Sequence, residues 1–326
     1  MTAETQAFSR HIPVLPNEVL EFLAPVPGGR YLDGTTGLGG HSSAILAAAP
    51  DSSLLGLDRD AEALEIASAR LAPFGDRVFL RQARFADAAE HLDALGWETV
   101  DGVLVDIGVS SLQLDTPERG FSFAHDGPLD MRMNQRGMAD CAVESSAAQL
   151  VNKAPFETLK EIIATLGEEP QAGRIARAIV EARATAPIAT TGELAAIVEK
   201  AYPAKWRATA RNHPATRTFQ ALRAAVNDEL GQLAAFLECI VPRIAVGGRI
   251  VVICFHSLED RIVKHYFRDE ATGCRCPRHV PRCICGHKAA LRVLTKKPVM
   301  ASAEELARNV RSSSAKLRAA ERVAEI

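Results

Sequence analysis

The sequence has no run of eighteen apolar residues, which is about the length that a membrane-spanning helix needs. An apolar signal segment near the N-terminus is missing as well, so we expect a cytoplasmic protein that does not contact a membrane. Excess charge of one sign is also missing, because the 326 residues carry a formal net charge of −2. A surface that binds nucleic acid would therefore be local. Internal repeats and low-complexity tracts are absent, and the length suits two structural units.

A glycine-rich stretch lacks the signatures of two common nucleotide sites. Residues 31–43, Tyr-Leu-Asp-Gly-Thr-Thr-Gly-Leu-Gly-Gly-His-Ser-Ser, lead from a short apolar strand through a turn into an alanine-rich helix. A dinucleotide fingerprint that began at Gly37 would need glycine in place of Ser42. A phosphate loop that began at Gly34 would need lysine in place of Gly40. The helix N-terminus still offers N–H groups, so we expect a ligand with a ribose and a carboxylate, such as S-adenosylmethionine.

Apolar strands alternate with helical segments in the first part of the chain, which indicates an α/β fold with a mostly parallel sheet covered on both faces. From about residue 115 to about residue 223 only helical periodicity appears. We therefore predict an α/β domain over residues 1–114 and 225–326, with an inserted helical domain over 115–224. The predicted helices are 17–23 (capped by Asn17), 43–49, 61–71, 82–95, 144–153, 156–166, 171–184, 192–202, 216–237 and 257–267, the last opened by a capping box from Ser257 to Asp260; the predicted strands are 53–57, 77–80, 102–106, 248–255, 291–294 and 315–323.

Acidic and aromatic residues follow the predicted strands: Asp33 lies at the glycine turn, and the others are Asp58, the segment from Phe85 to Asp87, and Asp106. Asp58 suits the two hydroxyls of a ribose, although Asp58 or Asp60 would equally cap the helix that begins at Ala61. Phe85, after the third strand, either lies against an adenine ring or packs inward. Ligands of open parallel sheets bind at the carboxyl ends of the strands, so these residues are candidates for one site.

Asp106, at the end of the fourth strand, is the candidate catalytic residue. Methyl transfer from a sulfonium to an exocyclic amine is an in-line displacement, and a carboxylate that accepts the amine N–H stabilises the charge developing on nitrogen. Alternatively, Asp106 contacts the methionine end of the cofactor, or it binds nearby loop N–H groups. We expect no catalytic metal, because a sulfonium needs no Lewis acid.

Two further segments have features of an RNA-binding surface. In residues 118–133, Phe121 and Phe123 would stack on an extruded base, and Arg119 and Arg132 would meet phosphate; the alternative is an ordered linker with two buried phenylalanines. Residues 171–223 contain nine Lys and Arg, three Glu and no Asp. This imbalance favours RNA contact over an ordinary solvated helix face.

The seven cysteines divide into two groups. Cys141, Cys239 and Cys254 lie in apolar or helical contexts and are predicted to be buried and reduced. The other four form two Cys-x-Cys pairs joined by a proline-rich turn. They would surround one structural zinc ion, or they are thiols in a mobile loop. These four are Cys274, Cys276, Cys283 and Cys285.

Seven motifs together resemble the bacterial 16S ribosomal RNA cytosine-N4 methyltransferases, the ribosomal RNA small subunit methyltransferase H family. The resemblance extends from about His11 to Arg322, and several of the motifs are long and peculiar to that family. The motifs are Asp33-Gly-Thr-Thr-Gly-Leu-Gly-Gly-His41, Leu57-Asp-Arg-Asp60, Leu104-Val-Asp-Ile-Gly-Val-Ser-Ser111, Glu118-Arg-Gly-Phe-Ser-Phe123, Asp126-Gly-Pro-Leu-Asp-Met-Arg-Met133, Phe255-His-Ser-Leu-Glu-Asp-Arg261 and Arg311-Ser-Ser-Ser-Ala-Lys-Leu-Arg318.

The resemblance implies a class I, Rossmann-like methyltransferase with S-adenosylmethionine as donor. The implied acceptor is the exocyclic amine of a cytidine in the decoding centre of 16S rRNA, within the small ribosomal subunit. The Asp/Asn-Pro-Pro-aromatic loop usual in amino methyltransferases is replaced here by Asp106-Ile-Gly-Val109, so base stacking would come from Phe121 or Phe123. The family's cofactor contacts fall on Gly39, Gly40, His41, Asp58, Phe85, Asp106 and Gln113.

Other functions stay open at this point. The chain would be a methyltransferase of another amine, or a non-catalytic RNA-binding module. A nucleotide-binding oxidoreductase would need a third glycine in the turn. Whether the chain forms a homodimer is open as well.

Overall fold

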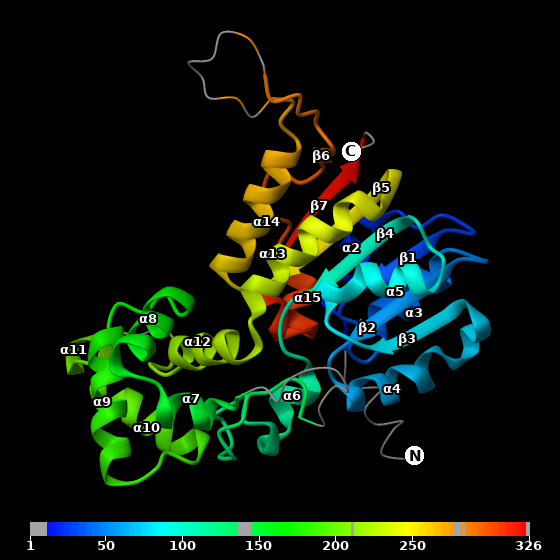
Figure 1. Ribbon diagram of the computed structural model, residues 1–326. Coiled ribbons are helices and arrows are strands. Elements are labelled where there is room, and N and C mark those ends of the chain that lie inside the picture. The colour runs from blue at the N-terminus through cyan, green and yellow to red at the C-terminus, as the bar shows by residue number, and fades with distance from the viewer. Residues whose placement is uncertain are drawn as a thin grey trace. The chain divides into compact units, whose positions relative to one another are not determined.

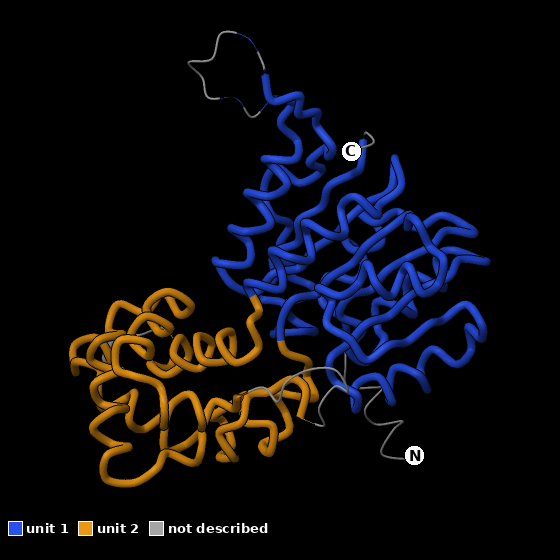
Figure 2. The backbone as a smooth tube through the Cα atoms, viewed as in Figure 1, with its two compact units in different colours: residues 1–108, 230–326 blue, residues 109–229 orange. Residues whose placement is uncertain are grey.

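The computed structural model describes residues 12–135, 145–209, 212–274, 276, 282 and 284–323. Contacts between residues divide the chain into two compact units (Figure 2). Unit 1 consists of residues 1–108 and 230–326, and unit 2 consists of residues 109–229. None of the described helices is long and apolar enough to cross a membrane.

The centre of unit 1 is a seven-stranded sheet in the order β3-β2-β1-β4-β5-β7-β6 (Figure 1). Strands β1 to β5 are parallel, and β7 runs antiparallel to both β5 and β6. This confirms the predicted mostly parallel sheet. The chain moves outward from β1 to β3 and then returns to β4 on the other side of β1, so the switch point of the sheet lies between β1 and β4. The strands are β1 Arg30–Asp33, β2 Ser53–Asp58, β3 Val78–Gln82, β4 Val100–Asp106, β5 Ile244–Cys254, β6 Leu291–Val293 and β7 Lys316–Arg322.

Helices cover both faces of this sheet, because alternate side chains of each buried strand point to opposite faces. Leu104 of β4 packs in one apolar cluster with α2, α3 and α4, whereas Val103 and Val105 pack in another with α5, α13 and α14. Figure 1 shows the two layers. The helices and 3₁₀ turns of this unit are α2 Pro16–Leu23, α3 Gly40–Ala48, α4 Ala61–Leu71, η1 Ala72–Arg77, η2 Phe85–Asp87, α5 Ala88–Ala94, α13 Glu229–Ile240, η4 Val241–Arg243, α14 Ser257–Glu270, α15 Ala303–Arg308 and η5 Val310–Ser314.

Unit 2 is built from short helices around its own apolar core. Leu159, Ile175, Leu194 and Leu222 come from four different helices and are fully buried in this core. Its described strand-like pairing is a single isolated bridge between Pro128 and Thr190. The elements are α6 Ser111–Asp115, η3 Pro117–Arg119, α7 Ala147–Lys153, α8 Phe156–Leu166, α9 Ala172–Thr185, α10 Thr191–Ala201, α11 Ala204–Thr209 and α12 Thr216–Asn227.

Three predictions about helices and their caps are wrong for local reasons. The long helix predicted over 216–237 is two helices, because Asp228 between them adopts a left-handed conformation with φ 49°. Asn17 does not cap α2, which starts with Pro16 at its first position and has no side-chain cap. The capping box of α14 pairs His256 with Glu259, one residue before the predicted pair.

Candidate functional site

Three of the predicted acidic residues end neighbouring strands of unit 1. Asp33 ends β1, Asp58 ends β2 and Asp106 ends β4. The strand register places Asp33 beside Gly56 of β2 and beside Leu104 of β4. The structure therefore brings the three carboxylates to the same edge of the sheet, around its switch point. Ligands of open α/β sheets bind at this edge.

The turn after β1 depends on glycine at two positions. Gly37 and Gly39 have φ of 50° and 76°, a left-handed conformation that strains other residues. A Cβ on Gly39 would also lie 3.3 Å from the side chain of Leu71 and 3.4 Å from Ala67. Gly39 is the N-cap of α3, so this helix begins at Gly40, three residues before its predicted start. The unbonded N–H groups of its first turn therefore belong to Gly40 and the next residues.

Asp58 connects β2 to this turn. Its Oδ2 accepts a hydrogen bond of 2.7 Å from the Gly37 amide, and its Oδ1 accepts one of 2.9 Å from the Asp60 amide. Asp60, rather than Asp58, caps α4 by accepting from the Glu62 amide. The structure thus decides between the two predicted alternatives for the cap. Each carboxylate oxygen of Asp58 keeps one further lone pair, which leaves ribose binding as a prediction.

Two hydroxyl groups that the sequence analysis missed hold the turn in place. Ser42 Oγ donates to Asp33 Oδ2 at 2.6 Å, and the Thr35 amide donates to Asp33 Oδ1 at 3.2 Å. Thr35 Oγ1 in turn accepts from the Asp106 amide at 2.6 Å. These bonds fix the turn against the ends of β1 and β4. The signal was available, because hydroxyl residues beside glycines in a loop that follows an acid often hydrogen-bond it.

The carboxylates make this edge strongly acidic. Burial raises the pKa of Asp33 by more than the hydrogen bond from Ser42 and the charge of His41 lower it, and the charge of Asp106 adds a smaller increase. Burial also raises the pKa of Asp58 to about 6, to which the charge of Asp33 contributes. Each charge therefore makes ionisation of its neighbour harder. An anionic ligand would add to this repulsion, whereas a cation placed among the three groups would relieve it.

Buried polar atoms without a described partner lie at the same edge. Within the described part of the chain, neither ring nitrogen of His41 has a hydrogen-bond partner, and neither has Asp106 Oδ1. His41 is 8% exposed, and its Nε2 lies 3.7 Å from Asp106 Oδ2. Buried polar groups are rarely left unsatisfied, so these atoms suit contact with a bound ligand.

Phe85 lies at the border between this edge and the core. Its ring packs edge-to-face on Phe236, with centroids 5.3 Å apart and an interplanar angle of 89°. A Cβ added to Gly34 would lie 3.1 Å from Phe85 Cβ, so the residue also adjoins the glycine turn. The ring is only partly buried. Inward packing, one of the two predicted alternatives, is confirmed, and the adenine contact stays a prediction.

Gln113, which the family resemblance places at the cofactor, belongs to unit 2. It is 4% exposed and forms a capping box with Ser110 at the start of α6. The Ser110 amide donates to Gln113 Oε1 at 3.1 Å, and the Gln113 amide donates to Ser110 Oγ at 3.2 Å. The side chain therefore has a clear structural role, and its contact with a cofactor stays a prediction.

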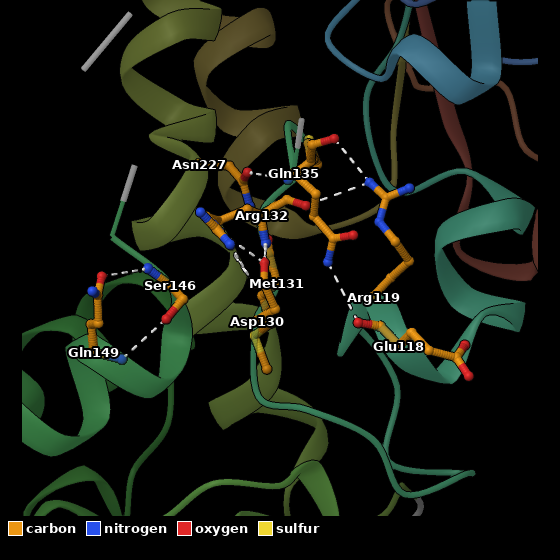
Figure 3. Close-up of polar contacts among 10 residues, drawn as sticks. Glu118, Arg119, Asp130, Met131, Arg132, Gln135, Ser146, Gln149 and Asn227 are labelled. Carbon is orange, nitrogen blue, oxygen red and sulfur yellow. Dashed lines mark hydrogen bonds and ion pairs between the residues drawn. The ribbon is translucent and has the colours of Figure 1, made fainter. Parts of the chain in front are cut away.

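The predicted phosphate-binding arginines of unit 2 are used inside that unit (Figure 3). Arg119 is 4% exposed and donates to the carbonyl of Met133 at 2.9 Å, so its predicted phosphate contact is wrong. Arg132 forms an ion pair of 2.7 Å with Asp130. Burial alone would raise the pKa of Asp130, but the hydrogen bonds and charge of Arg132 outweigh it and lower this pKa.

The same segment holds Met131 in a left-handed conformation with φ 62°. Asn227 supports it: its Nδ2 donates to the Met131 carbonyl at 2.8 Å, and its Oδ1 accepts from the Met133 amide at 3.0 Å (Figure 3). Phe121 is 7% exposed and packs in the core of unit 2. This agrees with the alternative prediction of an ordered linker with buried phenylalanines. Phe123 is partly buried and packs against His213, with ring centroids 4.7 Å apart.

The comparisons with known proteins identify the family of this chain. The model of the MraW methylase family matches residues 8–323. The chain belongs to this family. A relative from Nitratidesulfovibrio vulgaris strain DP4, named Ribosomal RNA small subunit methyltransferase H, is 65% identical over 317 residues, covering 97% of this chain and 96% of the relative. A relative of the same name from Desulfovibrio desulfuricans is 62% identical over 323 residues, covering 99% and 97%.

Membership of the MraW methylase family confirms the predicted methyltransferase class, and with it S-adenosylmethionine as the methyl donor. Likeness to solved structures is weaker. An rRNA methylase from Streptococcus thermophilus aligns with 95% of this chain and 94% of its own, at a TM-score of 0.40 and 10% identity. The fold assignment therefore rests on the strand order of the sheet.

Proposed function

We propose that this chain transfers the methyl group of S-adenosylmethionine to the N4 amine of a cytidine in 16S rRNA, in the decoding centre of the small ribosomal subunit. The observation that carries the proposal is the cluster of Asp33, Asp58 and Asp106 beside the glycine turn. A sulfonium cation suits such a cluster, and a phosphate does not. The relatives' name as ribosomal RNA small subunit methyltransferases supports RNA of that subunit as substrate.

The proposed cofactor position follows from the contacts of this edge. The first turn of α3, at Gly40 and His41, offers N–H groups to the carboxylate of the methionine part. Asp58 accepts the two ribose hydroxyls through the lone pairs that its bonds to Gly37 and Asp60 leave over. Phe85 borders the adenine ring. Gly39, Asp106 and Gln113 are the remaining cofactor contacts that the family resemblance implies.

Asp106 is the proposed acceptor for the reacting amine. Its Oδ1 is buried and has no described hydrogen-bond partner, and its backbone is fixed by the bond to Thr35. An N–H of the cytidine N4 amine that donates to Oδ1 draws the nitrogen lone pair out of conjugation with the ring. As the N–CH₃ bond forms, the S–CH₃ bond breaks and S-adenosylhomocysteine leaves; the carboxylate would stabilise the positive charge on nitrogen until its proton is lost to solvent. Holding donor and acceptor in line supplies much of the remaining acceleration.

Unit 2 is the proposed RNA-recognition domain, and the predicted α/β domain holds the cofactor. Around α11, Lys200, Lys205 and Arg207 are exposed, and Trp206 is 46% exposed. Cations that track phosphates, beside an aromatic ring that stacks on a base, are typical of RNA-binding surfaces. Other arginines of the basic segment are used within the unit: Arg183 donates to two backbone carbonyls, and Arg223 pairs with Glu229. The exposed group around α11 is therefore the better candidate. Such an enzyme works where ribosomes are made, in the cytoplasm.

The direct test uses small ribosomal subunits that lack the modification. They are incubated with the purified chain and S-adenosylmethionine labelled in its methyl group, and the RNA is then digested to nucleosides. We expect label in N4-methylcytidine of the 16S rRNA and in no other base. Fully modified subunits serve as the control and should accept no label. Label on ribosomal protein, or on another position of the RNA, would contradict the proposal.

A further inference from the structure

Three cysteine sulfurs converge in the segment between α14 and β6. The Sγ atoms of Cys274, Cys276 and Cys285 all lie within 4.8 Å of one another, and those of Cys274 and Cys285 are 3.9 Å apart. A disulfide would need about 2.05 Å between the two sulfurs. Two thiolates on one tetrahedral zinc ion, each with a bond of about 2.3 Å, lie about 3.8 Å apart. The observed separation therefore has the geometry of shared metal ligands.

This segment has no apolar core among its described residues. Its two ends are joined where the Ala290 amide donates to the Glu270 carbonyl at 2.9 Å. Between them, Ile284 is the large hydrophobic residue that the structure describes, and it is 81% exposed. Apolar burial therefore does not explain why the sulfurs converge. A bound metal ion would supply folding free energy to a segment whose described residues form no apolar core.

The surroundings of the sulfurs favour thiolate ligands. The Ile284 amide donates a hydrogen bond to Cys276 Sγ at 3.3 Å. A metal-bound thiolate accepts such a bond from a backbone N–H. Glu238, Asp269 and Glu270 line the hollow that Cys274 and Cys276 share, so deprotonation of these thiols depends on the bound metal. His287 adjoins the same hollow as Cys274 and Cys276, and its Nε2 is buried without a described hydrogen-bond partner.

We propose that Cys274, Cys276 and Cys285 bind one Zn²⁺ ion as thiolates, in a structural site. Each thiol that binds gives its proton to solvent. Sulfur ligands select zinc over magnesium or calcium, which prefer oxygen. A structural site is four-coordinate, so one further ligand completes it. His287 is the described residue suited to that position; Cys283, the fourth cysteine of the predicted cluster, lies outside the described residues.

The site is remote from the acidic edge. Helix α14 begins directly after the carboxyl end of β5 and is 14 residues long, so it extends about 21 Å along the unit. The C-terminal end of α14 lies next to β6, at the far end of the helix from the carboxyl edge of the sheet (Figure 1). The ion therefore holds the segment between α14 and β6, and it takes no part in methyl transfer.

The test measures the zinc content of the purified full-length chain by inductively coupled plasma mass spectrometry. We expect about one zinc ion per chain. Cys274→Ser and Cys285→Ser should lose it, and circular dichroism would show that both variants remain folded. Cys239→Ser is the matched control, because Cys239 lies on α13 and donates to the backbone carbonyl of Phe236. It should keep its zinc.

A second measurement does not depend on any variant. Zinc is removed from the parent chain with a chelator and replaced with Co²⁺. We expect thiolate-to-cobalt charge-transfer bands and the visible absorption of a tetrahedral cobalt site. The same experiment on His287→Ala and Cys283→Ser identifies the fourth ligand. Parent protein that holds no zinc after growth with zinc and that gives no such cobalt spectrum would overturn the proposal. Equal zinc in Cys274→Ser and Cys239→Ser would overturn it too.

Discussion

Replacing Asp58 with Asn tests the proposed ribose contact with little change in shape. In the parent chain, the two carboxylate oxygens of Asp58 accept the Gly37 and Asp60 amides. Asn keeps one acceptor oxygen and presents an NH₂ group in place of the other. That group faces an N–H donor and also cannot accept a ribose hydroxyl. A hydrogen bond to a charged acceptor contributes about 1.5–3 kcal/mol, so we expect the affinity for S-adenosylmethionine to fall by about 10- to 150-fold.

The pH dependence of the same variant gives a second, independent result. Burial raises the pKa of Asp58 in the folded chain from 3.8 to about 6. Between these pH values the folded chain binds more protons than the unfolded chain, so the Asp58 carboxyl lowers stability as the pH rises through this window. The full cost above pH 6 is on the order of 3 kcal/mol. The Asn variant lacks this cost. Its unfolding free energy relative to the parent should therefore rise by up to that amount between about pH 4 and about pH 6.

Both quantities can be measured on one preparation. Isothermal titration calorimetry at pH 8 gives the affinity for S-adenosylmethionine, and urea unfolding at pH 4.5 and pH 7.5 gives the stability. Asp60→Asn is the matched control for the calorimetry, since Asn caps a helix as well as Asp does and α4 should be unaffected. An Asn variant at position 58 that binds S-adenosylmethionine within twofold of the parent would refute the ribose assignment. A stability difference that does not change with pH would refute the buried charge.

Three further substitutions test other parts of the account. Asp106→Ala should lose methyl transfer by at least about 100-fold while S-adenosylmethionine still binds within tenfold, as measured by label transfer and calorimetry; parent-like transfer would remove Asp106 from the chemistry. Asn227→Ala breaks the bonds to Met131 and Met133 and should lower the unfolding free energy by about 3 kcal/mol in urea, whereas a loss under 0.5 kcal/mol would contradict this role. Trp206→Ala should weaken binding of small-subunit RNA by about 1–3 kcal/mol in a filter-binding assay and leave S-adenosylmethionine affinity unchanged; unchanged RNA binding would exclude Trp206 from the interface.

The sheet was largely predictable because its strands are short apolar segments between recognisable turns. β2 was predicted to within one residue, and α4 and α8 were predicted with their observed bounds. The failures have local causes. A single left-handed residue, Asp228, divides what periodicity presents as one long helix. The hydrophobic periodicity does not reveal such a break, because the apolar spacing is helical both before and after it.

The acidic residues of the candidate site were predicted from the sequence, whereas its hydroxyl groups were not. The three acids follow predicted strands, and ligands of open parallel sheets bind at the carboxyl ends of the strands. They are Asp33, Asp58 and Asp106. Thr35 lies in the turn after β1 and Ser42 in the first turn of α3, and their hydroxyl groups bond Asp106 and Asp33. The positive charge of Arg119 led to the wrong prediction of a phosphate contact, because this side chain is buried and hydrogen-bonded to the Met133 carbonyl. Counting basic residues does not reveal which of them remain exposed.

The most direct measurement of the central claim is the ligand preference of the acidic edge. Calorimetric titration of the purified chain with S-adenosylmethionine, NAD and ATP in turn compares a sulfonium with two phosphate-bearing ligands. We predict that S-adenosylmethionine binds with one site per chain and that neither NAD nor ATP produces a saturable signal. Saturable binding of NAD or ATP, with none of S-adenosylmethionine, would contradict the account.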